Sequence, residues 1–364
     1  MKIKEIRKYL EGIAPLSLQE SYDNSGLLVG SDNVECTGII TSLDVTEAVI
    51  KEAVAKNCNL IVAHHPIIFR GIKKLNGSNY VERTIIAAIK NDIAIYAIHT
   101  NLDNILEGVN KKIAEKLDLQ NCQSLLPQKG TLQKLVTFSP VEQAEAVRNA
   151  LFNAGAGAVG NYKECSFNVE GTGTFTASEG SHPFVGEIGK NHLEKEVRIE
   201  VIFPSFLQSK IIQALMEVHP YEEVAYYIQK LENVHSAIGS GLVGELAESI
   251  SERELLEKTK TAFGLSVIKH TRFLEKPVTK IAVCGGAGIF LLPAAIAAGA
   301  QAYITADVKY HDFFDADDRI LLADIGHYES EQFTVELLSD FLQQKFPNFA
   351  VLKTEINTNP VNYI

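Results

Sequence analysis

The sequence predicts an α/β protein made of two similar α/β halves that form one domain, interrupted by an inserted ferredoxin-like α+β domain. Short β-branched runs alternate with helical stretches in the first third of the 364 residues, and the same alternation returns in the last third. The middle third follows a different pattern. A hydrophobic share of 46% and a charged share of 22% are those of a globular protein.

In the first third, three nearly continuous apolar runs indicate buried strands. They cover residues 39–43, 60–63 and 93–98. Residues 47–56 and 81–90, which lie between these runs, carry apolar side chains at helical spacing. Strands that alternate with helices are typical of a parallel sheet covered by helices.

The last third repeats the pattern. We expect strands at 280–284, 302–305 and 320–324, a helix at 289–298 and an amphipathic stretch at 331–344. Residues 281–306 contain no charge and exceed the ~20 residues that cross a bilayer. Several glycines and Pro293 nevertheless divide them into a strand, a turn, a helix and a strand, so we expect no membrane span.

The two outer thirds can also be aligned with each other. Residues 56–65 and 298–307 each indicate a helix end, a tight turn and a strand whose carboxyl edge carries a potential ligand. Duplicated halves and a chance alignment of two β-α-β units explain this match equally well.

The middle third predicts two β-α-β passes around a central hairpin. The elements are strands at 132–138 and 197–203, helices at 142–152 and 208–218, and alternating segments at 167–169 and 172–176. This order predicts a compact ferredoxin-like sandwich. Because the α/β pattern resumes afterwards, we expect residues 127–234 to be inserted into a domain formed by 1–126 and 235–364.

Charge and cysteine content restrict the cellular role. The net charge is −11 and no basic run exceeds two residues, which argues against binding nucleic acid. The five cysteines are an odd number, far apart, with no CxxC pair, and the charged N-terminus lacks the apolar core of a signal peptide. A reducing, cytoplasmic location is expected.

The strand at 60–63 ends directly in His64 and His65, followed by Pro66. The chain turns at the carboxyl edge of a strand, where α/β sheets bind ligands, so both imidazoles can enter one crevice. Adjacent histidines there can serve two different metal ions. A pair of hydrogen-bonded structural histidines is the alternative.

Two further strand ends carry similar side chains. His99 and Asp103 follow the strand at 93–98, and the strand at 320–324 leads to His327 and Glu331. The last two stand at i and i+4 and therefore share one helical face. Asp103 taken alone indicates a turn or helix-capping residue.

Three strand ends thus supply imidazoles and carboxylates without thiolates, the donors that hard or borderline divalent ions prefer. The candidate metal ligands are His64, His65, Asp103, His327 and Glu331. Two ions suit five ligands better than one, because a single catalytic zinc usually has three protein ligands and an open position. Glu331 can bridge two ions separated by ~3.5–4 Å.

Two other motifs have plainer interpretations. Gly285-Gly286-Ala287-Gly288 follows a strand, but it lacks dinucleotide spacing and a P-loop lysine. A tight turn that permits close packing is therefore favoured over a phosphate-binding turn. His219 is interpreted as a turn residue of the inserted domain.

The motifs together resemble the NGG-interacting-factor-three-like family, also called the GTP cyclohydrolase 1 type 2 homologues. The resemblance covers both outer thirds, and Tyr22 stands where that family commonly has Trp. The motifs are Tyr22-Asp23-Asn24-Ser25-Gly26-Leu27, Leu43-Asp44-Val45-Thr46, Ala63-His64-His65-Pro66, His99-Thr100-Asn101-Leu102-Asp103, Cys284-Gly285-Gly286-Ala287-Gly288, Asp307-Val308-Lys309-Tyr310-His311 and Gly326-His327-Tyr328-Glu329-Ser330-Glu331.

The resemblance implies a dinuclear site with one ion on His64, Asp103 and Glu331 and the other on His65, His327 and Glu331. It also implies a ring-shaped homohexamer, a trimer of dimers, whose sites face an inner cavity. In the longer bacterial form the inserted domain is similar to the PII and CutA folds. Gly160-Asn161-Tyr162 and His219-Pro220-Tyr221-Glu222-Glu223 match that insert.

A metal pair at a sheet edge suits hydrolysis by metal-activated water, with His99 and His311 as candidates for proton transfer. Zinc is expected first, and iron, manganese or nickel are alternatives. The family name implies GTP, opened at guanine C8 with release of formate. A metal-dependent phosphoesterase and a non-enzymatic protein that stores, delivers or senses metal, with the insert as a regulatory module, are the alternatives.

Overall fold

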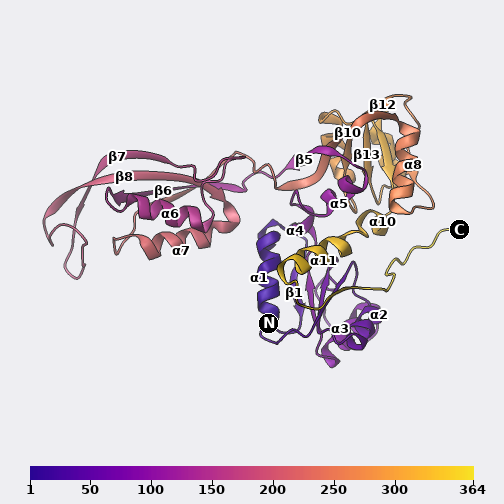
Figure 1. Cartoon of the computed structure of the whole chain (residues 1–364), viewed down its shortest axis with the longest axis horizontal. Helices are drawn as coiled ribbons and strands as arrows, with labels where there is room; N and C mark the ends of the chain where they lie inside the picture. The colour runs from indigo at the N-terminus through magenta and orange to yellow at the C-terminus, as the bar shows by residue number, and fades with distance from the viewer. The chain divides into compact units, whose positions relative to one another are not determined.

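The computed structural model describes all residues from 1 to 364. The chain divides into two compact units (Figure 1). Unit 1 comprises Met1–Leu126 and Ala237–Ile364, and unit 2 comprises Pro127–Ser236.

Unit 1 contains a five-stranded sheet with the order β1-β4-β3-β2-β15. Strands β15, β2, β3 and β4 are parallel neighbours, whereas β1 is antiparallel to β4. The bounds are β1 Gly26–Val29, β2 Ile39–Ser42, β3 Leu60–Ala63, β4 Ala94–Ala97 and β15 Val351–Lys353. Every residue of β2, β3 and β4 is buried, as expected of strands covered on both faces.

Unit 1 also contains a six-stranded sheet with the order β11-β14-β13-β12-β10-β5. Here β12, β13 and β14 are parallel, and β10 and β11 pair antiparallel with β12 and β14. The bounds are β5 Gln120–Pro127, β10 Gly239–Ser251, β11 Lys269–His270, β12 Pro277–Val283, β13 Ala302–Thr305 and β14 Leu321–Asp324.

The helices of unit 1 are α1 Ile3–Ile13, α2 Glu47–Ala55, α3 Tyr80–Lys90, α4 Thr100–Asp103, α5 Val109–Lys116, α8 Glu252–Phe263, α9 Leu292–Ala297, α10 His327–Glu331 and α11 Thr334–Lys345, with 3-10 turns η1 Leu16–Leu18, η3 Ile289–Leu291 and η4 Tyr310–Ala316. Local sequence explains several starts. Thr46 and Asn79 cap α2 and α3 through their side-chain oxygens, and Ser251 with Glu254 forms a capping box at α8. No helix is both long enough and apolar enough to cross a membrane.

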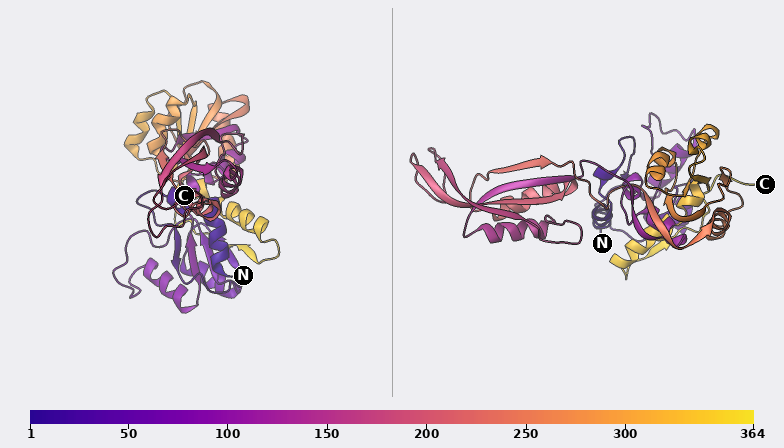
Figure 2. Two further views of the ribbon diagram at one scale, coloured as in Figure 1. Left: turned by 90° about the vertical axis from the view of Figure 1, so that its left-hand side faces the viewer. Right: turned by 90° about the horizontal axis from the view of Figure 1, so that it is seen from above.

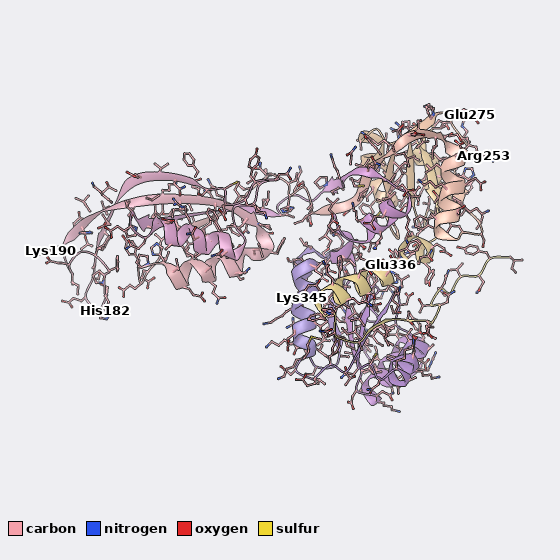
Figure 3. All side chains as sticks on the ribbon, viewed as in Figure 1. His182, Lys190, Arg253, Glu275, Glu336 and Lys345 are labelled. Atoms are coloured by element: carbon pink, nitrogen blue, oxygen red, sulfur yellow. The ribbon has the colours of Figure 1, made fainter.

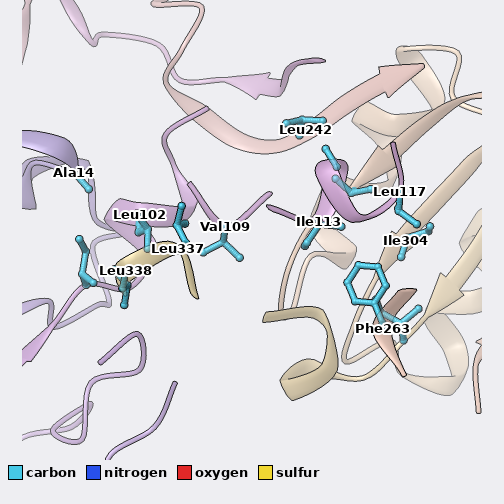
Figure 4. Close-up of a cluster of buried hydrophobic side chains, with 14 of the residues drawn as sticks. Ala14, Leu102, Val109, Ile113, Leu117, Leu242, Phe263, Ile304, Leu337 and Leu338 are labelled. Carbon is cyan, nitrogen blue, oxygen red and sulfur yellow. The ribbon is translucent and has the colours of Figure 1, made fainter. Parts of the chain in front are cut away.

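One cluster of buried apolar side chains joins the two sheets of unit 1. Figure 4 shows Ile113 of α5 between Leu102, which follows β4 in the chain, and Ile304 of β13. Full burial of such a side chain contributes ~1.5–3 kcal/mol. The shared core therefore fixes the edges of both sheets, from which the candidate ligands extend.

Unit 2 is a four-stranded antiparallel sheet with the order β7-β8-β6-β9. The bounds are β6 Leu132–Pro140, α6 Ala144–Ala154, β7 Phe167–Thr176, β8 Asn191–Pro204, η2 Ser205–Leu207, α7 Gln208–Val218 and β9 Tyr226–Lys230. Both helices pack on one face of the sheet, and β7 and β8 extend past the ends of the helices (Figures 1 and 2). The opposite face has no helix of unit 2 on it.

The structure confirms a mixed α/β fold with several sheets. The strands predicted at 60–63 and 302–305 and the helix at 208–218 agree with β3, β13 and α7 to the residue. The stretch at 331–344 differs, because Gly326, at a φ of 90°, starts a separate short helix that ends at Glu331. Its periodicity continues across a two-residue break into α11.

Candidate metal centre

The candidate ligands extend from strand ends of the two sheets of unit 1. His64 and His65 directly follow β3, and His99 follows β4, which is parallel to β3. Asp103 is the last residue of α4, one turn beyond His99. Because parallel strands bring their carboxyl ends to one edge, these side chains meet there.

His327 and Glu331 come from α10, which follows β14. The two residues lie on one face of this short helix, and the Nε2 of His327 is 3.1 Å from Oε2 of Glu331. The same Oε2 is 2.9 Å from Nε2 of His65. Glu331 is only 3% exposed and thereby links ligands from both sheets.

Four histidines of the centre share one arrangement, in which Nδ1 is occupied by an oxygen acceptor. The pairs are His64 with the Ile98 carbonyl at 2.9 Å, and His65 with Asp44, His99 with Asp23 and His327 with Asp307, each at 2.8 Å. Such a partner fixes the ring orientation and leaves Nε2 for the centre, as is usual for metal-binding histidines. The ligand atoms of His64, His65 and His99 lie within 4.8 Å of one another, as do those of His65, His327 and Glu331.

Two atoms of the centre are buried without a hydrogen-bond partner, Nε2 of His64 and Oδ1 of Asp103. They lie 3.6 Å apart, and Oε1 of Glu331 lies 3.8 Å from the same Nε2. Buried polar atoms without partners are rare because they are costly. Coordination of a cation satisfies all three atoms, so these residues fit a metal ion.

The glycine turn after β12 makes room for Glu331. A Cβ on Gly286 would lie 2.4 Å from Oε1 of Glu331, and one on Gly285 would lie 3.2 Å from its Cγ. Gly286 also has a φ of 61°. Close packing, the favoured interpretation of this motif, is therefore its observed use.

The electrostatics of the centre favour positive charge. Burial lowers the pKa of His65, but hydrogen bonds with Asp44 and Glu331 outweigh it and raise the pKa from 6.5 to about 10. Burial also lowers the pKa of His327, but hydrogen bonds with Glu331 and Asp307 outweigh it and raise the pKa to about 9.

The carboxyl groups behave differently from each other. Burial, reinforced by the charge of Glu331, raises the pKa of Asp103 from 3.8 to about 7. Burial acts on Glu331 in the same direction, but hydrogen bonds with the imidazoles, His327 foremost, hold its pKa well below 4.5. A buried, ionised Glu331 stabilises positive charge at the centre, either on protonated imidazoles or on a metal ion.

His311 has its observed contacts outside the cluster of imidazoles. It lies in η4, is exposed, and makes ring contacts with Tyr310 and Phe314. His99, in contrast, has its ring 5.2 Å from that of His64 and 5.5 Å from that of His65.

Asp23 and Asp44 lie in the sequence motifs without a predicted role, and Asp307 was predicted only as a potential ligand at a strand end. Asp44 and Asp307 each follow a strand, so the signal was present at the same sheet edges. Asp44 also accepts a hydrogen bond of 2.7 Å from the Thr358 hydroxyl. No local pattern indicated that contact.

A cavity of about 420 Å³ borders the centre. His65 and His327 line it on the side of the centre, together with Lys269 of β11. The C-terminal segment contributes Asn359 and Tyr363. The cavity gives a small molecule access to the imidazoles.

Fold and site together define a class: a mixed α/β protein with a cluster of imidazoles and carboxylates whose donor atoms could hold a metal ion. The chain belongs to the Duf34/NIF3 (NGG1p interacting factor 3) family, whose model matches residues 1–360.

Relatives in several bacteria carry the name GTP cyclohydrolase 1 type 2 homolog. The protein of Halalkalibacterium halodurans is 38% identical over 356 residues, covering 96% of each chain. That of Bacillus subtilis is 37% identical over 367 residues, covering 99% of this chain and 98% of the relative. A crystal structure of a Bacillus cereus protein related to NIF3 matches 100% of this chain and 99% of its own, with a TM-score of 0.88 and 37% identity.

Proposed function

We propose that unit 1 binds two divalent metal ions and uses them to hydrolyse a small molecule. His64, Asp103 and Glu331 hold one ion, and His65, His327 and Glu331 hold the other. The observation that carries this proposal is the pair of buried, unpartnered atoms, Nε2 of His64 and Oδ1 of Asp103, beside Glu331.

A pair of divalent ions lowers the pKa of bound water and stabilises developing negative charge. The chain itself supplies a group for proton transfer. Asp23 binds Nδ1 of His99 and is held in turn by the backbone N–H and hydroxyl of Thr100. His99 can therefore give or take a proton at Nε2, and its place beside His64 favours it over His311 for this role.

A pair of exposed aromatic rings beside the centre suits a nucleotide as substrate. Tyr22 and Phe69 are 64% and 46% exposed, their ring centroids lie 6.3 Å apart, and Phe69 is 6.3 Å from the ring of His99. These rings offer a surface on which a nucleobase can stack. Lys269, the lysine of the adjoining cavity, is paired with the buried carboxylate of Asp324 at 2.5 Å, and the names of the relatives point to GTP.

The test is turnover of GTP by untagged protein loaded with zinc, iron, manganese or nickel, with formate and phosphate measured separately. Formate release is the expected result, and Phe69→Ala should raise KM at least a few-fold while exposed Tyr162→Ala leaves it unchanged. Phosphate without formate would identify a phosphoesterase. No turnover of any nucleotide, despite tight and exchangeable metal, would favour storage, delivery or sensing. Elemental analysis of the same untagged protein identifies the metal.

We also propose that unit 1 consists of two similar halves and that unit 2 is an inserted PII/CutA-like module. In each sheet of unit 1, three consecutive strands, β2-β3-β4 and β12-β13-β14, are parallel and adjacent. Strands β5 and β10, which lead into and out of unit 2, are neighbours in one sheet. This supports an insertion at a single point.

Deleting residues 127–234 and joining the ends with a short flexible linker should leave a folded protein that binds as much metal per chain as the full chain. The physical reason is that all five candidate ligands, and the core that fixes them, belong to unit 1. Metal content and thermal unfolding measure the outcome. Aggregation at every linker length would show that the two units share one core.

A ring-shaped homohexamer, a trimer of dimers, is the assembly that family membership suggests. Chelation or mild acid should strip the metal without dissociating that oligomer, because one chain supplies every ligand of both proposed ions. Light scattering before and after chelation measures the mass. A fall to dimers or monomers would mean that metal ions link subunits, and the proposed hydrolytic role would lose its basis. A cytoplasmic location and the lack of a nucleic-acid partner stay predictions from composition.

A further inference from the structure

Unit 2 contains a cavity of about 750 Å³ that the proposed metal chemistry does not use. It lies on the sheet face opposite the helices: Val197 of β8 packs into the helical core, whereas its neighbours Glu196 and Arg198 line the cavity. The connection between β7 and β8, on which Figure 3 labels His182 and Lys190, contributes to its border. A cavity of this size accommodates a small organic molecule.

Aromatic rings form much of the cavity wall. The ring of Tyr221 lies 6.3 Å from that of Phe175 and 6.3 Å from that of Phe184. Phe138 and Tyr227 form a second, edge-to-face pair with centroids 5.9 Å apart. Aromatic faces of this kind attract cations and cover apolar groups.

A buried carboxylate, Glu196, lies at the cavity and is 9% exposed. Its Oε1 accepts a hydrogen bond of 2.8 Å from the Tyr221 hydroxyl. A Cβ on Gly173 would lie 2.2 Å from Oε2, so the glycine makes room for this carboxylate. The Tyr221 hydroxyl and the space beside Gly173 of β7 thus fix the position of the Glu196 carboxylate.

Hydrogen bonds of His219 hold Tyr221 in position at the cavity. Nε2 of His219 donates to the Phe138 carbonyl at 2.8 Å, and Nδ1 accepts from the Tyr221 N–H at 3.1 Å. The first bond attaches the turn after α7 to β6, and the second holds Tyr221 against His219 within that turn. His219 was predicted from the sequence to be a turn residue. The residues that follow it in this turn line one side of the cavity.

The charges around the cavity are predominantly negative. Glu170, Glu196, Glu222 and Glu223 line it against one guanidinium, that of Arg198. Arg198 is already paired with Glu200 at 2.7 Å. Arg198, which lies two residues from Glu196 on the same strand, is therefore already neutralised by Glu200.

We propose that this cavity binds a small organic cation, an ammonium or guanidinium group on an apolar body. The charge lies against Glu196 and the body against the aromatic rings. Aromatic faces together with a fixed carboxylate are the chemistry that recognises such cations. The site is separate from the metal centre and does not depend on the proposed hydrolysis.

Calorimetric titration of the full chain with choline, agmatine and spermidine tests the proposal. At least one of these cations should bind, and 3,3-dimethylbutan-1-ol, the neutral isostere of choline, should not compete with it. Binding should survive Glu331→Ala, which separates this site from the metal centre. Failure of all three cations to bind at millimolar concentration, or equal binding of the neutral isostere, would overturn the proposal.

Variants locate the bound cation. Glu196→Gln should raise the dissociation constant at least about tenfold, because a charge-assisted contact becomes a neutral one. Arg198→Gln should lower it, and Glu145→Gln, exposed on α6, is the matched control that should leave it unchanged. If Glu196→Gln does not fold, as judged by thermal unfolding, exposed Glu223→Gln at the same cavity should still weaken binding. Unchanged affinity in the folded carboxylate variants would place the cation elsewhere.

Discussion

Replacing Glu331 with alanine should abolish the binding of both proposed metal ions, whereas His65→Ala should abolish only one. The reason is the position of the Glu331 carboxylate, with Oε2 bound to His65 and His327 and Oε1 turned toward His64. Loss of an outer partner of a metal ligand already costs about 10–100-fold in affinity, so loss of a shared ligand should cost more. Metal per chain, measured by elemental analysis of untagged protein, checks the result.

Glu329→Ala is the matched control. Glu329 lies in the same short helix, but its Oε1 accepts a hydrogen bond from Asn359. We expect this variant to keep its metal, and all three variants to keep the far-ultraviolet circular dichroism of the parent, because the ligands lie at the sheet edges. Full metal occupancy in folded Glu331→Ala would show that the ligand set is wrong.

Metal affinity should fall steeply as the pH falls. With pKa values of about 10 and about 9, His65 and His327 are both imidazolium cations, with protons on both ring nitrogens, in the metal-free protein at neutral pH. An ion that binds both imidazoles must displace both protons, so its association constant should fall about 100-fold per pH unit below pH 9. For the ion on Asp103, proton competition sets in below pH 7, near the pKa of that carboxyl.

Zinc titrations against a competing chelator between pH 6 and pH 8 measure this slope. Asp44→Asn should reduce it, because one of the two hydrogen bonds that keep the proton on His65 loses its charge. An affinity that does not change over this range would show that metal binding displaces no proton from His65 or His327, and that these imidazoles are not ligands.

The strand ends were predictable because buried β-branched runs such as residues 60–63 mark both the strand and its edge. The residues that hold the imidazoles were not. An aspartate in a loop, such as Asp23, usually serves a turn, and its partner His99 is 76 residues away in the chain. Thr358 meets Asp44 across 314 residues, a contact that only the folded core creates.

In unit 2, too, local elements were predictable from the sequence and long-range contacts were not. The helix at 208–218 was predicted to the residue because its apolar spacing is local. The segment at 167–176 was predicted as two pieces because Gly171 interrupts its alternation, yet pairing with β8 keeps it one strand. The contact between Glu196 and Tyr221 depends on how a turn folds back on the sheet, and no local pattern encodes it.

The separation of the ligands along the chain bears on how the protein is made. Glu331 is incorporated 266 residues after His65, which at about 5–20 residues per second is a delay of roughly 13–53 s. For most of that time the nascent polypeptide has His64, His65 and Asp103 but lacks the carboxylate that joins them to His327. Metal loading is therefore an event of the assembled unit, and metal supplied during synthesis should fill the centre no sooner than metal supplied just after it.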